Sequence, residues 1–278
     1  MTHVRLPFGA WCAAGPRPGE PYVGPCLQAL DAALDHLEDA GLMVLLDLHG
    51  PVGGVNAGPP TGHQDARWSP ECFDPDASLA VLKTVAERYA GRFCVCGIGV
   101  ANEPAESLPA RDLAQYYEDA IRIVRQAGMR PGQVTVFLPI YTERRVRDFL
   151  ALWEEAYPKY EDSAFDLHFY QCFGAAWTML PLSIQLQKAR DRAQLLKSLP
   201  ACSVTEWSLA LPPFATRGLS EEDQRSARKS FAEAQLEVYD ICTTHGWFFW
   251  TWKDSNHITW SMRDCLEEGI LQLPSPSS

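Results

Sequence analysis

Short apolar runs alternate along this chain with longer amphipathic patterns, and this alternation limits the folds open to it. Several runs are almost continuously apolar, which is typical of strands covered on both faces. Between the runs, apolar residues recur at helical spacing, as in residues 27–40 before Gly41. Strands that alternate with helices predict parallel β–α–β units. Seven strands are expected, at residues 3–8, 43–49, 95–103, 134–139, 165–170, 202–208 and 246–253.

The expected fold class is α/β, a TIM (β/α)8-type barrel that lacks the usual first strand at its N-terminus. A closed barrel of this type has eight strands, and here the chain opens directly on a strand. Residues 1–273 are expected to form a single domain, with residues 274–278 as a frayed tail. The expected helices cover residues 27–40, 77–90, 113–127, 143–157, 182–199 and 221–244.

Two glutamates directly follow apolar, strand-like runs. Glu103 lies in the string ANEP (101–104), and Glu206 lies in TEWS (205–208). Side chains in these positions sit on the face where a β/α barrel carries its catalytic residues. Two such carboxylates are the minimum apparatus for cleaving a glycosidic bond. Either glutamate alone is more simply explained as a surface residue or an ion-pair partner, so the neighbouring residues decide the interpretation.

Other polar and aromatic side chains occupy the same positions on further strands. Each has a structural explanation: a histidine can be hydrogen-bonded in the core, and a tryptophan can simply fill it. Their convergence from six strands at one end has no structural explanation. Arg5 is expected to hold Glu206 ionised, because a neighbouring cation lowers a carboxyl pKa. The remaining candidates at strand ends are His49, Asn102, His168, Tyr170 and Trp252, and loops 50–72 and 209–219 are expected to build the substrate site.

Charge excludes some partners. The net charge of −11 and pI near 5.1, without a run of basic residues, argue against nucleic acid and suit a neutral substrate. No apolar run reaches membrane length, so no membrane partner is expected. The paired-carboxylate chemistry needs no metal and no organic cofactor. Monomer and homo-oligomer remain equally open.

Nine cysteines are expected to be mainly buried free thiols, since none has CxxC spacing and several lie in apolar runs. The chain has no N-x-[ST] sequon, and its N-terminus lacks a signal-peptide layout. A soluble, cytoplasmic protein is therefore favoured, with secretion open if the N-terminus is truncated.

Six strings together resemble glycoside hydrolase family 5, in the wider clan of retaining β/α-barrel glycosidases. Among its members the chain is most similar to the fungal-type exo-β-1,3-glucanases. The strings occur in the family's order, from residue 1 to about residue 273. They are VRLPFGAW (4–11), LDLHGPVGGVN (46–56), IGVANEP (98–104), HFYQCF (168–173), TEWS (205–208) and FWTWK (249–253).

The resemblance implies a role for each candidate residue. Glu206 would be the nucleophile and Glu103 the general acid/base of a double displacement on a β-glucan oligosaccharide or a glucoside. The supporting residues would be Arg5 and His49 beside the nucleophile, Asn102 on the sugar 2-hydroxyl, His168 and Tyr170 orienting the carboxylates, Trp252 under the sugar ring, and Phe173 as one side of an aromatic clamp.

The chain departs from the family in two places. The first strand is missing, and the loop after His49 reads AGPPTG (57–62), without the clamp aromatic expected there. Cleavage of β-glucosidic bonds is therefore expected, whereas the linkage and the exo or endo mode stay open. The alternatives are an endo-β-1,4-glucanase, a β-glucosidase with an opened cleft, a transglycosylase, and an inactive glycan-binding relic.

Overall fold

The computed structural model describes residues 1–61, 67–156 and 161–273. Within these ranges the chain forms two compact units, Met1–Asp166 and Leu167–Ser278. The expected frayed tail, 274–278, and the expected helix end at Tyr157 lie outside the described residues. A single domain over residues 1–273 stays a prediction. No helix in the described ranges has both the length and the apolar character needed to cross a membrane.

The first unit contains parallel strands that pair in chain order. β1 pairs with β2, β2 with β3, and β3 with β4, all in parallel. The register sets Pro7 beside Asp47 and Ile98 beside Leu46. β5 begins next to β4, where Val136 N–H donates to the Asp162 carbonyl at 3.1 Å. The bounds are β1 (His3–Gly9), β2 (Met43–Gly50), β3 (Val95–Gly99), β4 (Thr135–Tyr141) and β5 (Ser163–Phe169).

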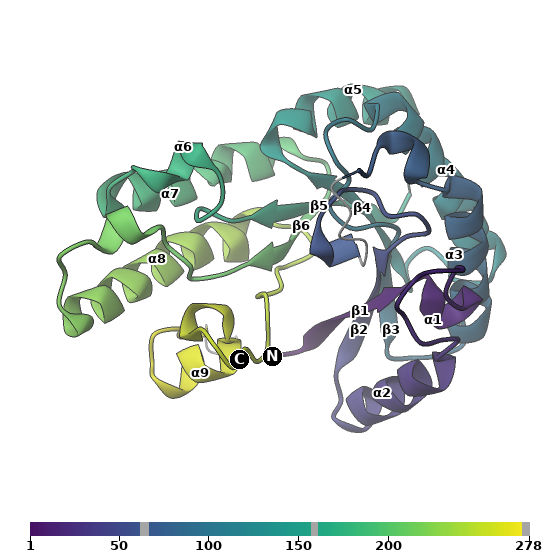
Figure 1. Ribbon diagram of the computed structural model, residues 1–278, viewed down its shortest axis with the longest axis horizontal. Helices are drawn as coiled ribbons and strands as arrows, with labels where there is room; N and C mark the ends of the chain where they lie inside the picture. The colour runs from purple at the N-terminus through teal and green to yellow at the C-terminus, as the bar shows by residue number, and fades with distance from the viewer. Residues whose placement is uncertain (62–66, 157–160, 274–278) are drawn as a thin grey trace. The chain divides into compact units, whose positions relative to one another are not determined.

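Helices follow these strands and supply the rest of the first unit's core. α3 packs against α4, as Figure 1 shows. α3 begins where Asp74 accepts the Ala77 N–H at 3.0 Å, with a proline in the first turn, and both are typical helix starts. Leu34 of α2 and Leu82 of α3 are fully buried, like Leu46 of β2. The helices are α1 (Trp11–Ala14), α2 (Leu27–Asp39), α3 (Pro75–Tyr89), α4 (Ala110–Gln126) and α5 (Val146–Ala156), with short 3-10 turns η1 (Pro59–Thr61), η2 (Pro70–Cys72) and η3 (Glu143–Arg145).

The second unit contains the end of β5, followed by β6 beside it and a pair of long helices, α7 and α8, packed together (Figure 1). Its core centres on Trp207, whose ring packs edge-on against Tyr239, Trp247 and Phe249. Ser220 caps α8 by accepting the Asp223 N–H at 3.1 Å. The bounds are α6 (Ala175–Thr178), α7 (Leu182–Ser198), β6 (Cys202–Trp207), η4 (Pro213–Thr216), α8 (Glu221–Cys242), η5 (Ile258–Trp260) and α9 (Met262–Glu267).

The predicted order of strands and helices is confirmed. The prediction of a seventh strand at residues 246–253 is wrong. In the described chain that segment has one bridge residue, Trp247, opposite Val204. It still runs along β6: Phe248 N–H donates to the Val204 carbonyl at 2.9 Å, and Trp250 N–H to the Trp207 carbonyl at 2.8 Å. After Trp250 the pairing with β6 ends, because the Thr251 N–H donates to the Trp260 carbonyl of η5 at 2.7 Å, so no regular ladder forms.

Candidate active site

Four polar side chains of the first unit, from β1, β2 and the segment after β3, form a closed ring of contacts. Arg5 Nη2 lies 2.9 Å from Asp47 Oδ2 and donates to Asn102 Oδ1 at 2.9 Å. The same Asp47 oxygen lies 2.7 Å from His49 Nδ1, and His49 Nε2 lies 3.2 Å from Asn102 Nδ2. Parallel pairing of β1 with β2 and of β2 with β3 brings these residues together from three neighbouring parts of the sheet. Each side chain therefore orients the next.

The contacts within the ring determine which nitrogen of His49 carries the proton. Arg5 can only donate, so the oxygen of the Asn102 amide faces Arg5 and its nitrogen faces His49. The Asn102 amide nitrogen also only donates, so His49 Nε2 accepts. The remaining nitrogen, Nδ1, then carries the proton and donates it to Asp47. This leaves one further Asn102 N–H for a ligand.

Asp47 is the centre of the ring and is completely buried. A buried carboxylate is costly unless charged or hydrogen-bonding partners compensate it, and here Arg5 and His49 do so through one oxygen. The other oxygen, Oδ1, has no hydrogen-bond partner among the described residues. It lies against Gly99 of β3, where an added Cβ would approach Oδ1 to 2.7 Å. The absence of a side chain at Gly99 makes room for the carboxylate.

Glu103 lies in the short segment after β3, on a strained stretch of backbone. Its φ of 49° is in the left-handed region, which is unusual for a residue with a side chain. Asn56, from the loop after β2, holds this backbone by donating its amide N–H to the Glu103 carbonyl at 2.7 Å. The Asn56 side-chain oxygen in turn accepts the Gly58 N–H at 2.6 Å. The loop after β2 therefore positions Glu103.

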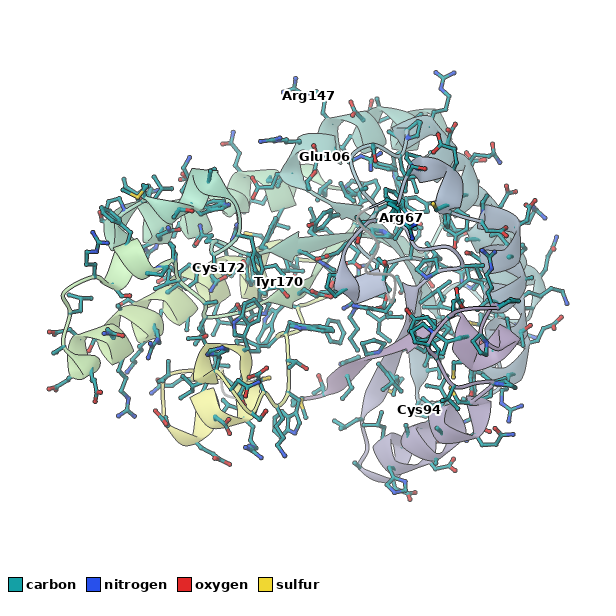
Figure 2. The ribbon with its side chains drawn as sticks, in the orientation of Figure 1. Arg67, Cys94, Glu106, Arg147, Tyr170 and Cys172 are labelled. Carbon is teal, nitrogen blue, oxygen red and sulfur yellow. The ribbon has the colours of Figure 1, made fainter. Side chains whose placement is uncertain are left out.

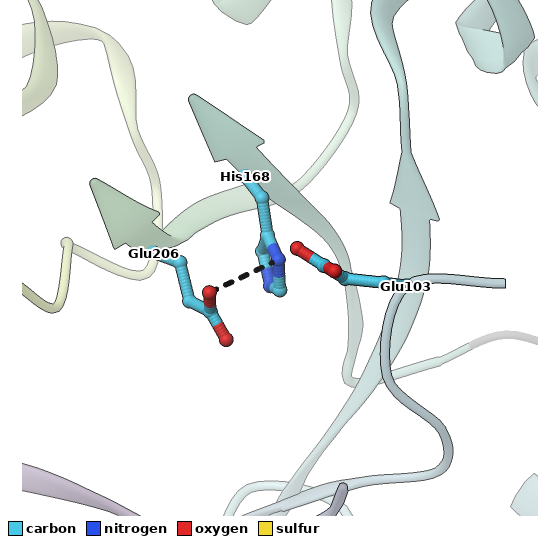
Figure 3. Close-up of side chains that lie close together, drawn as sticks. All are labelled: Glu103, His168 and Glu206. Atoms are coloured by element: carbon cyan, nitrogen blue, oxygen red, sulfur yellow. Dashed lines mark ion pairs between the residues drawn. The ribbon is translucent and has the colours of Figure 1, made fainter. Parts of the chain in front are cut away.

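Glu206 stands near the end of β6 in the second unit, where its side chain is almost fully buried at 4% exposure. Tyr170 donates its hydroxyl to Glu206 Oε2 at 2.8 Å. His168 Nδ1 lies 3.5 Å from the same oxygen, and Figure 3 marks this ion pair. His168 Nε2 lies 3.1 Å from Thr205 Oγ1, which orients the ring. The carboxylate thus has fixed donors on one side.

Aromatic side chains surround Tyr170 in the second unit; Figure 2 labels it beside Cys172, just after β5. Phe173 and Trp260 pack against Tyr170 with ring centroids 5.5 and 5.3 Å away, and their own centroids are 5.8 Å apart. Phe173 remains 60% exposed, and Trp252 is 49% exposed. These exposed rings provide flat apolar faces of the kind that suits sugar C–H surfaces. Burial raises the pKa of the Cys172 thiol to about 11, so it stays protonated.

Most candidate residues lie near the carboxyl end of a strand or shortly after it, whereas Arg5 lies within β1 and Trp252 follows no regular strand. In the first unit it brings together Arg5, His49 and Asn102, and in the second His168, Tyr170 and Glu206. The role of Arg5 toward Glu206 and the roles taken from the resemblance stay predictions. Within either unit alone, the described residues do not bring three His, Cys, Asp or Glu ligand atoms together.

Sequence reasoning assigned no role to three residues of the site: Asp47, Asn56 and Trp260. A signal existed for Asp47, because it lies two residues before His49 on the same strand face and is charged inside an apolar run. Asn56 lies in the loop after β2 and Trp260 ends η5, and their contacts depend on tertiary structure that no local pattern shows.

Comparison with known proteins identifies the family. The family model described as "Cellulase (glycosyl hydrolase family 5)" matches residues 1–256. The chain therefore belongs to glycosyl hydrolase family 5, and its class is that of the glycoside hydrolases. The resemblance inferred from the six strings is confirmed.

Known proteins with similar sequences align with almost the whole chain. A "Probable glucan 1,3-beta-glucosidase A" of Neosartorya fischeri is 30% identical over an alignment of 314 positions, which covers 99% of this chain and 71% of the relative. A "Glucan 1,3-beta-glucosidase" of Blumeria graminis is 28% identical, over 100% of this chain and 71% of the relative.

Solved structures show the same fold at lower identity. Rutinosidase from Aspergillus niger superimposes with a TM-score of 0.73 at 17% identity, covering 97% of this chain and 78% of that one. Endo-glycoceramidase II from Rhodococcus sp. has a TM-score of 0.59 at 17% identity, over 94% and 67% of the two chains. The β/α-barrel fold class is thereby confirmed, with six strands in the described residues where a complete barrel has eight.

Proposed function

We propose that this protein is a retaining β-glycosidase that hydrolyses β-glucosidic bonds by double displacement, with Glu206 as nucleophile and Glu103 as general acid/base. The observation that carries the proposal is the buried Glu206 carboxylate, held by the Tyr170 hydroxyl in a chain of glycosyl hydrolase family 5. A carboxylate held by fixed donors keeps the orientation that it needs for attack on the anomeric carbon.

Two displacements make up the proposed reaction. In the first, Glu206 attacks the anomeric carbon while Glu103 gives its proton to the departing glycosidic oxygen, and a covalent glycosyl-enzyme forms. In the second, Glu103 takes a proton from water as that water displaces Glu206 from the sugar. Each displacement inverts the anomeric carbon, so the product keeps the β configuration.

The ring around Asp47 supports the substrate in this scheme. The free Asn102 N–H is available for the sugar 2-hydroxyl, a contact that strengthens as positive charge develops at the ring in the transition state. Arg5 and His49 hold the amide in the required orientation. The exposed Trp252 and Phe173 rings supply faces for the sugars.

A pair of variants tests the proposal. Glu206→Gln should reduce turnover of 4-nitrophenyl β-glucoside by several orders of magnitude, while far- and near-UV circular dichroism stay unchanged. Glu103→Gln should also lose activity, and activated aryl leaving groups, which need little protonation, should be cleaved better than laminarin. Proton NMR of the first product should show the β anomer. Normal turnover by Glu206→Gln, or an α product, contradicts the proposal.

For the substrate we propose a β-1,3-glucan, cut from its end, because the relatives over 99% of this chain carry the name glucan 1,3-beta-glucosidase. Product sizes from laminarin, lichenan and cellulose oligomers test this. Glucose as the sole early product from laminarin supports it. A ladder of oligomers instead identifies an endo-acting enzyme, glucosyl transfer to a second sugar identifies a transglycosylase, and saturable binding without any hydrolysis identifies a glycan-binding relic.

We also propose a reducing, cytoplasmic location, supported by the nine cysteines, all of which are free thiols. Fractionation of the cells that produce the protein, with an antibody against the chain, tests this directly. Recovery of the chain in the culture medium contradicts it.

A further inference from the structure

A cavity of about 310 Å³ opens in the first unit beside the ends of β1 and β2, lined by none of the ring residues described above. Its walls are the segment that follows β1, including Trp11, Arg17, Glu20 and Tyr22, together with residues 51–53 after β2, Thr61 and Ala77. The volume lies at the lower end of the range for small-molecule sites, about 300 to 1,000 Å³. It suits one sugar ring better than a long oligosaccharide segment.

The wall of this Trp11 pocket is a rigid aromatic pair. Trp11 and Tyr22 stack with centroids 3.8 Å apart and planes 13° from parallel. Trp11 is also pressed onto two glycines at strand ends: an added Cβ would lie 2.2 Å from its ring at Gly9 and 2.8 Å at Gly50. Both rings are half-buried, so part of each remains accessible. The aromatic surface is therefore attached to the same strands that carry Arg5 and His49.

The polar rim of the Trp11 pocket is also held in place. Arg17 Nη2 lies 2.5 Å from Asp74 Oδ2 at the start of α3. The Glu20 carboxylate accepts the Arg17 backbone N–H at 2.8 Å. Further along, Cys26 N–H donates to the Cys12 carbonyl at 2.8 Å, which closes the segment onto α1. A pocket whose walls are fixed in advance binds at a lower cost in conformational entropy.

The charges at the rim select a neutral ligand. The Arg17 guanidinium is already paired with Asp74, and the Glu20 carboxylate lines the same wall, so an anion such as phosphate would meet no uncompensated positive charge there. Burial, and then the Glu20 carboxylate, raises the pKa of Tyr22, so its hydroxyl stays protonated and can donate. A flat aromatic surface with hydrogen-bonding groups at its edge matches the apolar face and hydroxyl edge of a pyranose.

We propose that the Trp11 pocket binds a glucosyl residue of the glucan, remote from the residue whose bond is cleaved. The inference rests on the proposed function for its substrate. Loops after parallel strands of a β/α barrel form its functional face, and this pocket follows the first two strands on that face. Remote contacts of this kind add binding energy that a short substrate cannot use.

The experiment compares substrates of different length. The ratio of kcat/KM for laminarihexaose to that for 4-nitrophenyl β-glucoside is measured for the wild-type protein, Tyr22→Ala and Tyr22→Phe. Loss of one stacked ring should lower this ratio about tenfold in Tyr22→Ala. Tyr22→Phe keeps the ring and should retain most of the ratio. Phe93→Ala is the matched control, because Phe93 is exposed beside the opposite, N-terminal end of β3.

Three outcomes contradict glucan binding in the Trp11 pocket. The first is an unchanged ratio in Tyr22→Ala, and the second is an equal fall of kcat/KM for both substrates in that variant. The third is a wild-type kcat/KM that is no higher for laminarihexaose than for 4-nitrophenyl β-glucoside. If the protein hydrolyses no glucan, the proposed function fails separately. Calorimetric titration of laminarihexaose into the wild-type protein and Tyr22→Ala then decides the inference. Weaker binding by Tyr22→Ala than by Phe93→Ala supports the pocket, and equal binding overturns it.

Discussion

His49 Nδ1 lies 2.7 Å from Asp47 Oδ2, and this contact makes Asp47 the buried anchor of the first unit's polar ring. Asp47 holds the proton of His49 on Nδ1, His49 then accepts from Asn102, and Asn102 accepts from Arg5. Arg5 returns to the same Asp47 oxygen. The order of the ring depends on one carboxylate that itself reaches no solvent.

Asp47→Asn should therefore affect both stability and activity. Removing the charge breaks the buried ion pair between Arg5 and Asp47, and breaking such a pair typically costs about 3 to 5 kcal/mol. The free energy of unfolding in urea measures this loss. Catalytic turnover should also fall, because an amide at position 47 no longer fixes the His49 tautomer.

The control for Asp47→Asn is Asp35→Asn, which removes a carboxylate paired with Arg92 at 2.8 Å on the exposed surface. Such exposed pairs contribute less than about 1 kcal/mol. Nitrogen-15 NMR of the histidine rings reports the His49 tautomer independently of activity. An unchanged unfolding midpoint and an unchanged His49 spectrum in Asp47→Asn would show that the ring does not depend on this carboxylate.

Gly99→Ala should disturb the same ring from the neighbouring strand. The new Cβ would lie 2.7 Å from Asp47 Oδ1 and 3.5 Å from its Cα, so the carboxylate must move. Overpacking of this kind costs about 1 to 3 kcal/mol. Gly91→Ala is the matched control, because a Cβ there meets no atom within 4 Å. Thermal unfolding of both variants decides the point: equal melting temperatures would refute the tight fit.

Tyr170→Phe should slow catalysis with little effect on folding. The variant removes the hydroxyl that donates to Glu206 Oε2 at 2.8 Å, and a hydrogen bond to a charged group contributes about 1.5 to 3 kcal/mol. If that bond orients the nucleophile, kcat should fall about 10- to 100-fold. Tyr117→Phe is a control with the opposite expected result, because it removes a buried hydrogen bond to the Pro139 carbonyl that does not involve Glu206. Its free energy of unfolding should fall by about 1 kcal/mol, and its kcat should stay unchanged. Equal kcat in both variants would remove Tyr170 from the mechanism.

The strands were predictable because burial on both faces leaves a continuous apolar run in the sequence. β2, β5 and β6 are buried along almost their whole length, and each was recognised within a few residues of its bounds. The segment 246–253 has the same apolar character, since Trp247 and Phe249 pack around Trp207. It is not a regular strand because an apolar run indicates burial and does not specify hydrogen-bond pairing.

Site residues could be predicted from the sequence where their position relative to a strand was enough to place them at the site. Glu103, Glu206 and His49 follow apolar runs, and parallel strands end at one edge. The role of Asp47 depends on which side chains the neighbouring strands bring to it, Arg5 and His49, and partners from other strands leave no local pattern. The left-handed backbone of Glu103 and its support by Asn56 are likewise consequences of the loop after β2.

The last prediction concerns the pH dependence of stability, through the buried thiol of Cys202. This thiol donates to the Leu196 and Cys242 carbonyls, and burial raises its pKa to about 11. The folded state therefore holds the proton more tightly than the unfolded state, whose cysteine titrates near pH 8.5. Between about pH 8.5 and 11 the unfolded chain loses this proton while the folded chain keeps it, so the thiol's contribution to stability is complete below this window and declines through it.

Cys202→Ala should remove that slope. Urea unfolding at pH 8, 9, 10 and 11 gives the difference in unfolding free energy between the wild-type protein and the variant. The difference should narrow with rising pH, by at most about 3 kcal/mol, because each unit of pKa shift is worth about 1.4 kcal/mol. Cys72→Ala removes an exposed thiol, so the difference in unfolding free energy between this variant and the wild-type protein should be the same at every pH. A constant difference between Cys202→Ala and the wild-type protein from pH 8 to 11 would contradict the raised pKa and the burial that causes it.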